Sequence, residues 1–446
     1  MAAGVIVTLL TITLVSTTAV GFDSCVSDKG DPEDLSVIHI YGKCSPFNAP
    51  SPSSSWANTV INMAAKDPER LSYLSSLVAQ RPTSAPIASG QNVLNIGNYV
   101  VRAKIGTPGQ LMFMVLDTSS DNAWVPCSGC YGCSSAVFAP NASATYASMD
   151  CTLPECTQVR GLACPSAGAG AGACLFNQSY GGDSSFSATL SHDSLRLGTD
   201  IIPNYAFGCI NAVSGNNVPP QGLLGLGRGS MSLLSQSGPL YSGVFSYCLP
   251  SFKSYYFSGS LKLGPLGQPK NIRTTPLLKS PHRPSLYYVN LTSVSVGRVT
   301  VPIAPELLAF DPVSGSGTII DSGTVITRFA KPAYEAIRDE FRNRVSGPFS
   351  TIGARLPFST IGAFDTCFAV THESVAPAIT FHFQGLDLVL PMENTLIHTS
   401  AGNLACLAMA AGNSVLNVIA NLQQQNLRIL FDTANSRLGI ARELCN

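Results

Sequence analysis

Charged residues are scarce in this chain of 446 residues: they make up 12% of it, and 26 Lys and Arg residues balance 26 Asp and Glu residues. That share is about half of what soluble domains usually contain. A neutral chain has no basic surface for nucleic acid, so we expect no nucleic-acid partner. The 45% of apolar residues argues against disorder of the whole chain. The length favours two or more domains.

Apolar runs long enough to cross a bilayer are missing after residue 21, so we expect no membrane anchor there. Residues 1–21 are apolar and Thr-rich and end in a small-x-small pattern, from Ala19 to Gly21. This is typical of a signal peptide. The alternative is an N-terminal transmembrane anchor, but the segment is short and lies at the very start. We therefore expect a secreted, extracellular protein.

The 14 cysteines agree with an oxidising compartment. Without Cys25 and Cys44, which lie in the N-terminal segment, twelve remain and could form six disulfides. Zinc is the competing hypothesis, because Cys127, Cys130 and Cys133 are spaced like ligands. No His lies near them and no matching second pair follows, so we expect no metal. Three glycosylation sequons, which fit a secreted chain, begin at Asn141, Asn177 and Asn290.

Residues 22–90 differ from the rest in composition. They contain a Pro/Ser tract, a predicted helix that starts with Asp67 as N-cap and Pro68 as its first residue, and a Pro-rich linker at residues 81–86. This order is typical of a zymogen prosegment; the alternative is an ordinary N-terminal extension. From residue 93 onward, short β-branched and aromatic runs alternate with Gly, Pro, Ser and Asn, which predicts strands. The clearest helix is expected at residues 332–345.

The chain contains one internal repeat. Residues 114–120 and 318–324 both run from an apolar strand into Asp, a hydroxyl residue, a small residue and another hydroxyl residue. Each is followed further on by a second apolar segment, at residues 222–227 and 417–422. Such a duplication predicts two similar lobes. The expected boundaries are a signal peptide at 1–21, a prosegment at 22–90, an N-terminal lobe at 91–265 and a C-terminal lobe at 266–446.

The repeat places one carboxylate in each half, Asp117 and Asp321. Two carboxylates that share a site cannot both ionise, so one keeps a proton. The pair can then take a proton from water and protonate a carbonyl without a nucleophilic side chain. The alternative is that each Asp only caps a turn.

The residues beside each Asp fit a shared site. Thr118 and Ser322 could hydrogen-bond across the lobe interface, and Ser120 and Thr324 could donate to the outer carboxylate oxygens. Gly323 permits close backbone approach.

These motifs resemble the pepsin-like aspartic proteases, and most closely the plant nepenthesin-type branch with its secreted apoplastic aspartyl proteases. The segments that carry the resemblance span nearly the whole chain: residues 105–108, 117–124, 207–209, 245–249, 318–324, 421–426 and 431–441. The resemblance implies an all-β, bilobal fold with a central cleft and an acid endopeptidase made as a zymogen. It also implies a protein or peptide substrate, no cofactor, a monomer, and secretion to the apoplast.

The resemblance also implies roles for single residues. Asp117 and Asp321 match the catalytic pair, and Tyr180 matches the tyrosine of a hairpin flap that closes over substrate, with Trp124 packed near it. The other residues expected to face the substrate are Thr118, Ser119, Gly323 and Thr324. The cysteine-rich insert of the family matches residues 127–174. The disulfides implied are Cys367 with Cys406 and Cys248 with Cys445; the other eight cysteines remain unassigned.

Three departures from the family pattern favour a second hypothesis. Ser119 and Ala420 stand where the family has Gly, and the flap reads Tyr-Gly-Gly-Asp-Ser. A Cβ at either position could crowd the Asp loops, so reduced activity is one expectation. The alternative function is a weak or inactive pepsin-like binding protein that inhibits glycosidases. A third idea, a nucleoid DNA-binding relative, conflicts with the neutral charge and the signal peptide.

Overall fold

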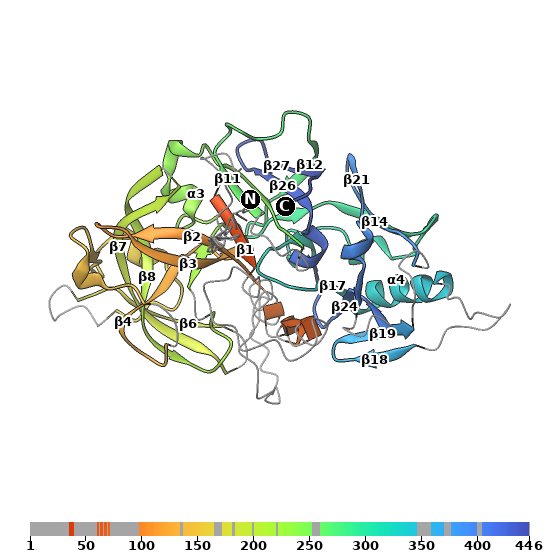
Figure 1. Ribbon diagram of the computed structural model, residues 1–446, viewed down its shortest axis with the longest axis horizontal. Helices are drawn as coiled ribbons and strands as arrows, with labels where there is room; N and C mark the ends of the chain where they lie inside the picture. Colours follow the sequence, from red (N-terminus) through yellow and green to blue (C-terminus); the bar gives the residue numbers. More distant parts are fainter. Residues whose placement is uncertain are drawn as a thin grey trace, which may run out of the picture.

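The structure is a computed structural model (Figure 1). It describes residues 35–39 (backbone), 60–61, 63–65, 67–68, 70–71, 98–133, 137–164, 172–180, 183–198, 200–219, 222–251, 259–345, 358–369, 376–398 and 404–445. The expected signal peptide, the Pro/Ser tract, the linker at 81–86, Cys25 and Cys44 lie outside these residues. None of the helices within them is both long and apolar enough to span a bilayer.

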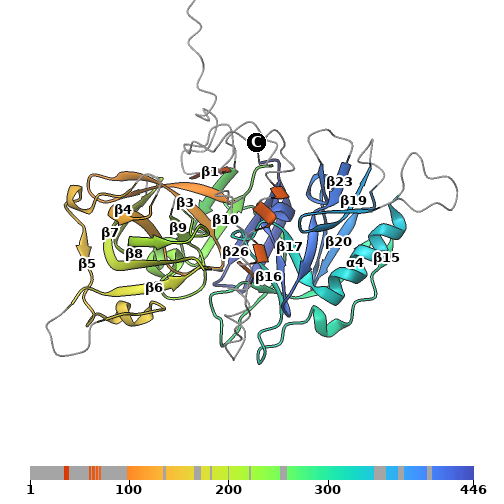
Figure 2. The same cartoon turned by 90° about the horizontal axis from the view of Figure 1, so that it is seen from below.

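Two β-rich lobes lie side by side, and strands between them join both into one large sheet (Figure 1 and Figure 2). The all-β, bilobal expectation is confirmed. The strands of the first lobe are β2 (Tyr99–Ile105), β3 (Gln110–Asp117), β4 (Trp124–Tyr131), β5 (Ala147–Ser148), β6 (Leu175–Ser179), β7 (Ser185–Leu197), β8 (Asp200–Ser214) and β9 (Leu223–Gly225). The strands that join the lobes are β1 (Leu35–His39), β10 (Val244–Cys248), β11 (Gly259–Leu263), β12 (Arg273–Leu278), β26 (Leu427–Asp432) and β27 (Arg437–Arg442).

The second lobe continues this sheet and adds two four-stranded sheets. Its strands in the large sheet are β13 (Tyr288–Val289), β16 (Gly317–Ile320), β17 (Thr327–Ala330), β24 (Met409–Gly412) and β25 (Leu416–Ile419). The smaller sheets are built from β14 (Leu291–Val296), β15 (Val299–Thr300), β20 (Ile379–Phe383) and β21 (Leu386–Val389), and from β18 (Ser359–Ile361), β19 (Phe364–Ala369), β22 (Leu396–His398) and β23 (Leu404–Leu407).

Helices are few and short in the described part of the chain. The α-helices are α3 (Leu233–Gln236) and α4 (Lys331–Arg344), and the 3₁₀ turns are η1 (Pro140–Ala142), η2 (Pro154–Gln158), η3 (Gly238–Leu240), η4 (Pro305–Leu307), η6 (Met392–Asn394) and η7 (Asn421–Gln424). Helix α4 lies within one residue of the range expected from sequence. Its buried residues Ala333, Tyr334, Ile337 and Phe341 form one face, which packs against the second lobe.

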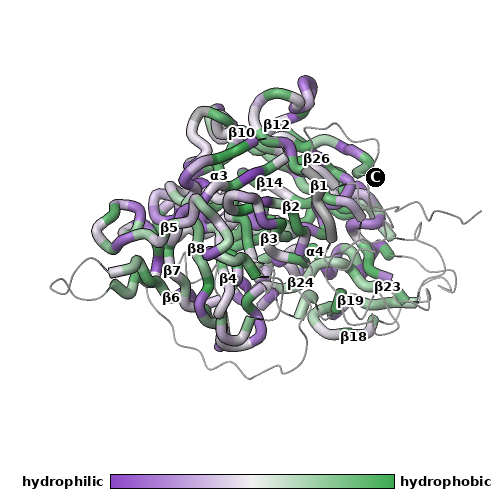
Figure 3. The backbone as a smooth tube through the Cα atoms, turned by 60° about the vertical axis from the view of Figure 1, so that its left-hand side comes forward, coloured by the Kyte–Doolittle hydropathy of each residue, from purple (hydrophilic) through white to green (hydrophobic). Residues whose placement is uncertain are grey.

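The main hydrophobic core runs without interruption from one lobe into the other. Between them, the rings of Phe245 on β10 and Phe431 on β26 stack with centroids 4.5 Å apart, and Tyr287 packs edge-on against Phe431 at 4.6 Å. Such aromatic pairs add stability beyond the area they bury. Figure 3 shows apolar segments along these central strands. The lobes therefore share a core and are not separate domains on a flexible linker.

The described part of the N-terminal segment packs into this framework. Strand β1 pairs with β2 and β11, and the helical residues between 60 and 71 lie between the two lobes (Figure 1 and Figure 2). The expectation that Asp67 is an N-cap is wrong: it lies among helical residues, and its carboxylate accepts the backbone N–H groups of Val325 (3.1 Å) and Ile326 (2.8 Å). Tertiary contacts in the second lobe therefore replace the local cap. Residues 72–78 of the expected helix lie outside the described residues.

Candidate active site

The internal repeat corresponds to the same strand arrangement in each lobe. Strand β3 ends in Asp117 and lies parallel to β9, with Asp117 opposite Gly225. Strand β16 runs parallel to β25 and leads directly into Asp321, whose N–H donates to the carbonyl oxygen of Ile419 (3.0 Å). In both lobes, a buried apolar strand beside a second one delivers an Asp to the lobe interface.

Hydrogen bonds between the lobes hold the two Asp loops together. The N–H of Thr118 donates to Ser322 Oγ (3.2 Å), and the N–H of Ser322 donates to Thr118 Oγ1 (3.0 Å). Ser322 Oγ also donates to the carbonyl oxygen of Leu116 (2.9 Å). Thr118 and Ser322 are fully buried, so water does not compete for these bonds. The exchange across the interface that the sequence suggested is present.

Each carboxylate accepts hydrogen bonds from the residues that follow it. Asp117 Oδ1 accepts the N–H and the Oγ hydroxyl of Ser119, both at 2.8 Å, and Oδ2 accepts Ser120 Oγ at 2.9 Å. Asp321 accepts the N–H of Gly323 (2.9 Å) and Thr324 Oγ1 (2.7 Å). The two loops differ in one of these hydrogen bonds, because Ser119 donates a hydroxyl to Asp117 and its counterpart Gly323 has none to donate to Asp321.

The second carboxylate lies deep in the interface. Burial raises the pKa of Asp321, and the neighbouring charge of Asp117 raises it further, whereas Arg70 opposes the shift. Gly323 lies so close to the first carboxylate that a Cβ would be 2.7 Å from Asp117 Oδ1. This close approach is the physical reason for glycine at that position.

Arg70, which the sequence analysis did not single out, reaches both carboxylates. Its Nη2 donates to Asp117 Oδ1 (2.8 Å) and Oδ2 (2.6 Å), contacts Ser119 Oγ, and lies 3.9 Å from Asp321 Oδ2. The guanidinium is almost fully buried. No local motif marks this arginine, because its contact depends on how the N-terminal segment packs between the lobes. The centre of the site is thus occupied by a side chain of the same chain.

Asp67 provides a second anchor for this segment. Its carboxylate is buried at the second lobe, where burial raises its pKa to about 6. Arg328 lies 3.9 Å from it and also donates to the carbonyl oxygens of Ala64 (3.0 Å) and Ala411 (3.1 Å). The helical residues 60–71 are therefore fixed at Arg70 and at Asp67.

Tyr180 lies next to Arg70, directly after the end of β6. Its N–H donates to the carbonyl oxygen of Ser184 (2.8 Å), which closes the hairpin toward β7. Its ring meets Trp124 edge-on with centroids 6.1 Å apart, and its hydroxyl accepts from Arg70 Nη1 (3.5 Å). Residues 181–182 of the expected flap lie outside the described residues. The geometry places an aromatic hairpin, a tryptophan and two carboxylates together.

Comparisons with known proteins agree with this geometry. Family models described as "Xylanase inhibitor N-terminal" and "Xylanase inhibitor C-terminal" match residues 99–265 and 286–442. The chain is 63% identical over 433 residues to Aspartyl protease AED3 of Arabidopsis thaliana, covering 95% of this chain and 94% of that one. The chain belongs to the plant aspartyl protease family. It is an aspartic-type endopeptidase.

Further relatives and solved structures extend the comparison. The chain is 51% identical to Aspartyl protease 25 of Oryza sativa subsp. japonica (92% and 94% covered) and 33% identical to Aspartic proteinase nepenthesin-1 of Nepenthes gracilis (78% of each). The crystal structures of edgp and of conglutin gamma, a basic 7S globulin from lupine seeds, each match with a TM-score of 0.60. They share 19% and 18% identity and cover 78% and 77% of this chain, and 92% and 91% of theirs, which shows a common fold.

Two departures of this protease from the family pattern fit without displacing the Asp loops. Ser119 is buried, and both its N–H and its hydroxyl bind Asp117. Ala420 is fully buried, and its N–H donates to Thr327 Oγ1 (3.0 Å). At both positions the side chain is accommodated while the hydrogen bonds of the neighbouring loop are kept. The substitution at 119 also adds a hydrogen-bond donor to the site.

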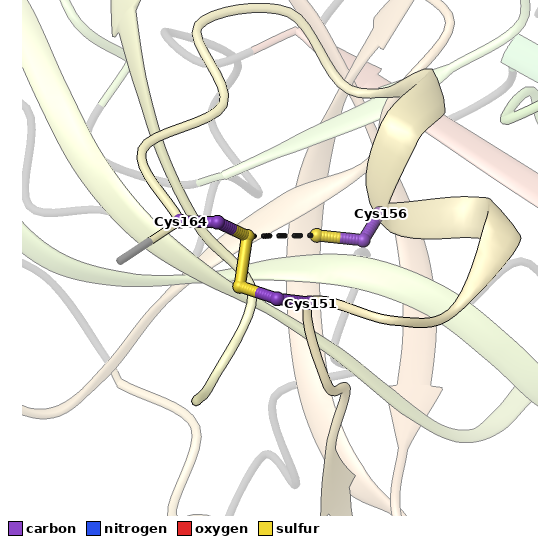
Figure 4. Close-up of side chains that lie close together, drawn as sticks. All are labelled: Cys151, Cys156 and Cys164. Carbon is purple, nitrogen blue, oxygen red and sulfur yellow. Dashed lines mark hydrogen bonds between the residues drawn. A yellow bond between two sulfur atoms is a disulfide. The ribbon is translucent and has the colours of Figure 1, made fainter. Parts of the chain in front are cut away.

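Six disulfides connect the cysteines of the described residues: Cys127–Cys209, Cys130–Cys133, Cys151–Cys164, Cys156–Cys174, Cys248–Cys445 and Cys367–Cys406. The two pairs implied by the family resemblance are among them. Cys151, Cys156 and Cys164 lie close together because two disulfides are adjacent, with 3.5 Å between the sulfur atoms of Cys156 and Cys164 (Figure 4). Each of these three sulfurs is bonded to another sulfur, so none of them is a thiolate that could bind a metal ion.

Proposed function

We propose that Asp117 and Asp321 are the catalytic pair of this endopeptidase and that Arg70 keeps its secreted precursor inactive. The supporting observation is that two buried carboxylates, one from each lobe, lie within 4 Å of one guanidinium nitrogen. No local turn requires such an arrangement. Two carboxylates that close together hold one proton between them at acid pH, and they titrate as a pair.

The geometry supports different starting roles for the two carboxylates. Asp117 accepts three hydrogen bonds from Ser119 and Ser120, which suits the base, whereas burial raises the pKa of Asp321, which suits the acid. Asp117 takes a proton from water as the water oxygen attacks the peptide carbonyl carbon. Asp321 gives its proton to the carbonyl oxygen. Asp117 then passes its proton to the leaving nitrogen as the C–N bond breaks, and Asp321 takes back the hydroxyl proton.

Substrate binding involves the residues around this pair. Tyr180 packs against Trp124 and accepts a hydrogen bond from Arg70, the residue that contacts both carboxylates, so the hairpin is the proposed flap over a protein or peptide substrate. Thr118, Ser119, Gly323 and Thr324 line the loops that bring both carboxylates to the substrate. Arg70 occupies the position where the attacking water and the carbonyl would lie, so the N-terminal segment must leave before catalysis begins.

The proposed enzyme is secreted, glycosylated and monomeric. Six disulfides fit an oxidising compartment, and the resemblance points to the apoplast. The side chains of Asn141 and Asn177 are exposed, and Asn290 is half-buried with its amide donating to Gln384 Oε1 (3.0 Å). We expect glycans at all three sequons and a monomer in solution. Mass spectrometry of the secreted protein, before and after removal of N-linked glycans, tests the sequons directly.

The deciding experiment is acid proteolysis of an unfolded generic protein by the processed enzyme, with and without pepstatin. Asp117→Asn and Asp321→Asn should each abolish cleavage. Asp339→Asn, which alters an exposed carboxylate on α4, is the matched control and should keep full activity. Full activity in either dyad variant would rule out the mechanism.

A pepsin-like binding protein is the second candidate, because the matching family models are described as xylanase inhibitor domains. A folded sample without its N-terminal segment that cleaves nothing between pH 3 and 6 would favour this candidate. The next measurement would then be inhibition of a xylanase by the same sample.

A further inference from the structure

A cavity of about 230 Å³ opens beside the first carboxylate of the proposed catalytic pair. Ser119 and Ser120, which donate to Asp117, form one wall, and Trp124, which packs against Tyr180, forms another. Arg160 lies at its edge, contributed by the cysteine-rich insert. The cavity therefore adjoins the loop that carries Asp117 and is large enough for one side chain of a bound peptide.

The residues that line the cavity are mostly polar, and two of them, Asp121 and Arg160, can carry a charge. The carboxylate of Asp121 is engaged: Oδ1 accepts the N–H of Gly229 (2.7 Å) and Oδ2 accepts Ser285 Oγ. Burial also raises the pKa of Asp121, which favours its neutral form in acid. Arg160 is exposed, and it is the one basic residue among the described residues that line the cavity. A ligand that enters the cavity therefore meets one cationic side chain, that of Arg160, while the Asp121 carboxylate beside it is already engaged.

The insert holds Arg160 in place despite the exposure of its side chain. Disulfides Cys151–Cys164 and Cys156–Cys174 close the turn around it. The N–H of Asn177 on β6 donates to the carbonyl oxygen of Gly161 (2.8 Å). A Cβ on Gly161 would lie 1.8 Å from the Asn177 carbonyl oxygen, so only glycine allows this contact. The turn is thereby attached to the strand that leads to Tyr180.

We propose that this cavity, which we call the Arg160 pocket, binds one side chain of the substrate and selects a carboxylate or carboxamide over a cation or an apolar group. The inference rests on the proposed function of the neighbouring pair. A lysine would be repelled by Arg160. An apolar side chain would displace water from the polar lining, including Gln158 and Gln178, without replacing its hydrogen bonds, and such mismatches carry much of enzyme selectivity.

The test uses internally quenched peptides cleaved at one bond, in which each position within three residues of that bond is in turn Glu, Gln, Leu or Lys. At pH 5 a substrate Glu is mostly ionised. We expect one position at which Glu exceeds Lys in kcat/KM by about tenfold, as close charge contacts at a partly exposed site allow. Arg160→Gln should reduce this ratio to below threefold, Arg160→Glu should invert it, and Arg160→Lys should retain it.

Arg196→Gln is the matched control, because it removes an exposed arginine from β7 in the same lobe. An unchanged Glu-to-Lys ratio in Arg160→Glu, or an equal loss in Arg196→Gln, would overturn the pocket assignment. The Leu peptides separate this outcome from failure of the proposed function. If no Leu peptide is cleaved in a pepstatin-sensitive manner, the catalytic pair itself is wrong; if they are cleaved, only the pocket is in question.

Discussion

Replacing Arg70 by Ala should make the intact precursor active. The guanidinium contacts both oxygens of Asp117 and approaches Asp321, with 8% of its side chain exposed. Removing one partner of a buried ion pair typically costs about 3–5 kcal/mol. When Arg70 is removed, water and a proton shared by Asp117 and Asp321 can replace part of the lost interaction. We therefore use the lower end of this range. About 3 kcal/mol corresponds to a roughly 100-fold larger population of the open precursor.

The assay is the initial rate of peptide cleavage by freshly purified full-length chain, measured before any processing is visible on a denaturing gel. We expect Arg70→Ala to cleave about 100 times faster than the wild-type precursor, and Arg70→Lys to lie between them because one charge remains. Arg196→Ala, the same change at an exposed position, should match wild type. After removal of the N-terminal segment, all four proteins should have equal rates.

The pH dependence of the same assay gives a second criterion. Arg70 lowers the pKa of Asp321, so docking of the segment is favoured by ionised carboxylates and weakens as the pH falls through their titration. The contribution of Arg70 to docking should therefore be lost in acid, and the Arg70→Ala precursor should lack this part of the pH dependence. If the Arg70→Ala precursor is as inactive as wild type at every pH, while both become equally active once trimmed, the occluding role of Arg70 is refuted.

Three further predictions concern the site and its supports. Ser119→Gly removes a hydroxyl donor to Asp117, so the acid limb of the kcat/KM profile should move upward by roughly one pH unit, as measured by peptide hydrolysis from pH 2 to 7. Ser322→Ala deletes a buried bond to Leu116 and a bond between the lobes, and should lower the unfolding free energy by about 2 kcal/mol in urea titrations. Because the pKa of Asp67 rises from 3.8 to about 6 on folding, precursor stability should fall as the pH rises through that interval, and Asp67→Asn should flatten that part of the stability profile.

The sequence predicted those parts of the site that depend on local, repeated patterns. The strand–Asp–hydroxyl repeat placed Asp117 and Asp321 at equivalent positions, and the hydroxyls of Thr118 and Ser322 were expected to bond across the interface, as they do. A short motif dictates these contacts because strand pairing carries each motif to the same interface. Helix α4 was likewise predictable, since Pro332 near its start and the Ser-Gly-Pro sequence at residues 346–348 mark both of its ends within a single stretch of sequence.

Contacts between distant segments could not be predicted in the same way. Arg70 and Asp117 are 47 positions apart, and only the packing of the N-terminal helix between the lobes brings them together. Local sequence likewise predicts Asp67 to be a helix cap, because the contact of its carboxylate with the second lobe depends on residues far away in the chain. The pairing of eight cysteines also depends on which strands become neighbours, and connectivity cannot be derived from spacing alone.

The difference between the two halves matters as much as their similarity. Two carboxylates in identical surroundings would bind their shared proton equally well. Ser119 donates a hydroxyl to Asp117, whereas Gly323 leaves Asp321 without the equivalent donor, and burial raises the pKa of Asp321. The extra donor at Asp117 and the raised pKa of Asp321 therefore favour different starting roles for two carboxylates that are both fully buried. The same serine was the feature that cast doubt on activity, and its contacts instead support an active pair.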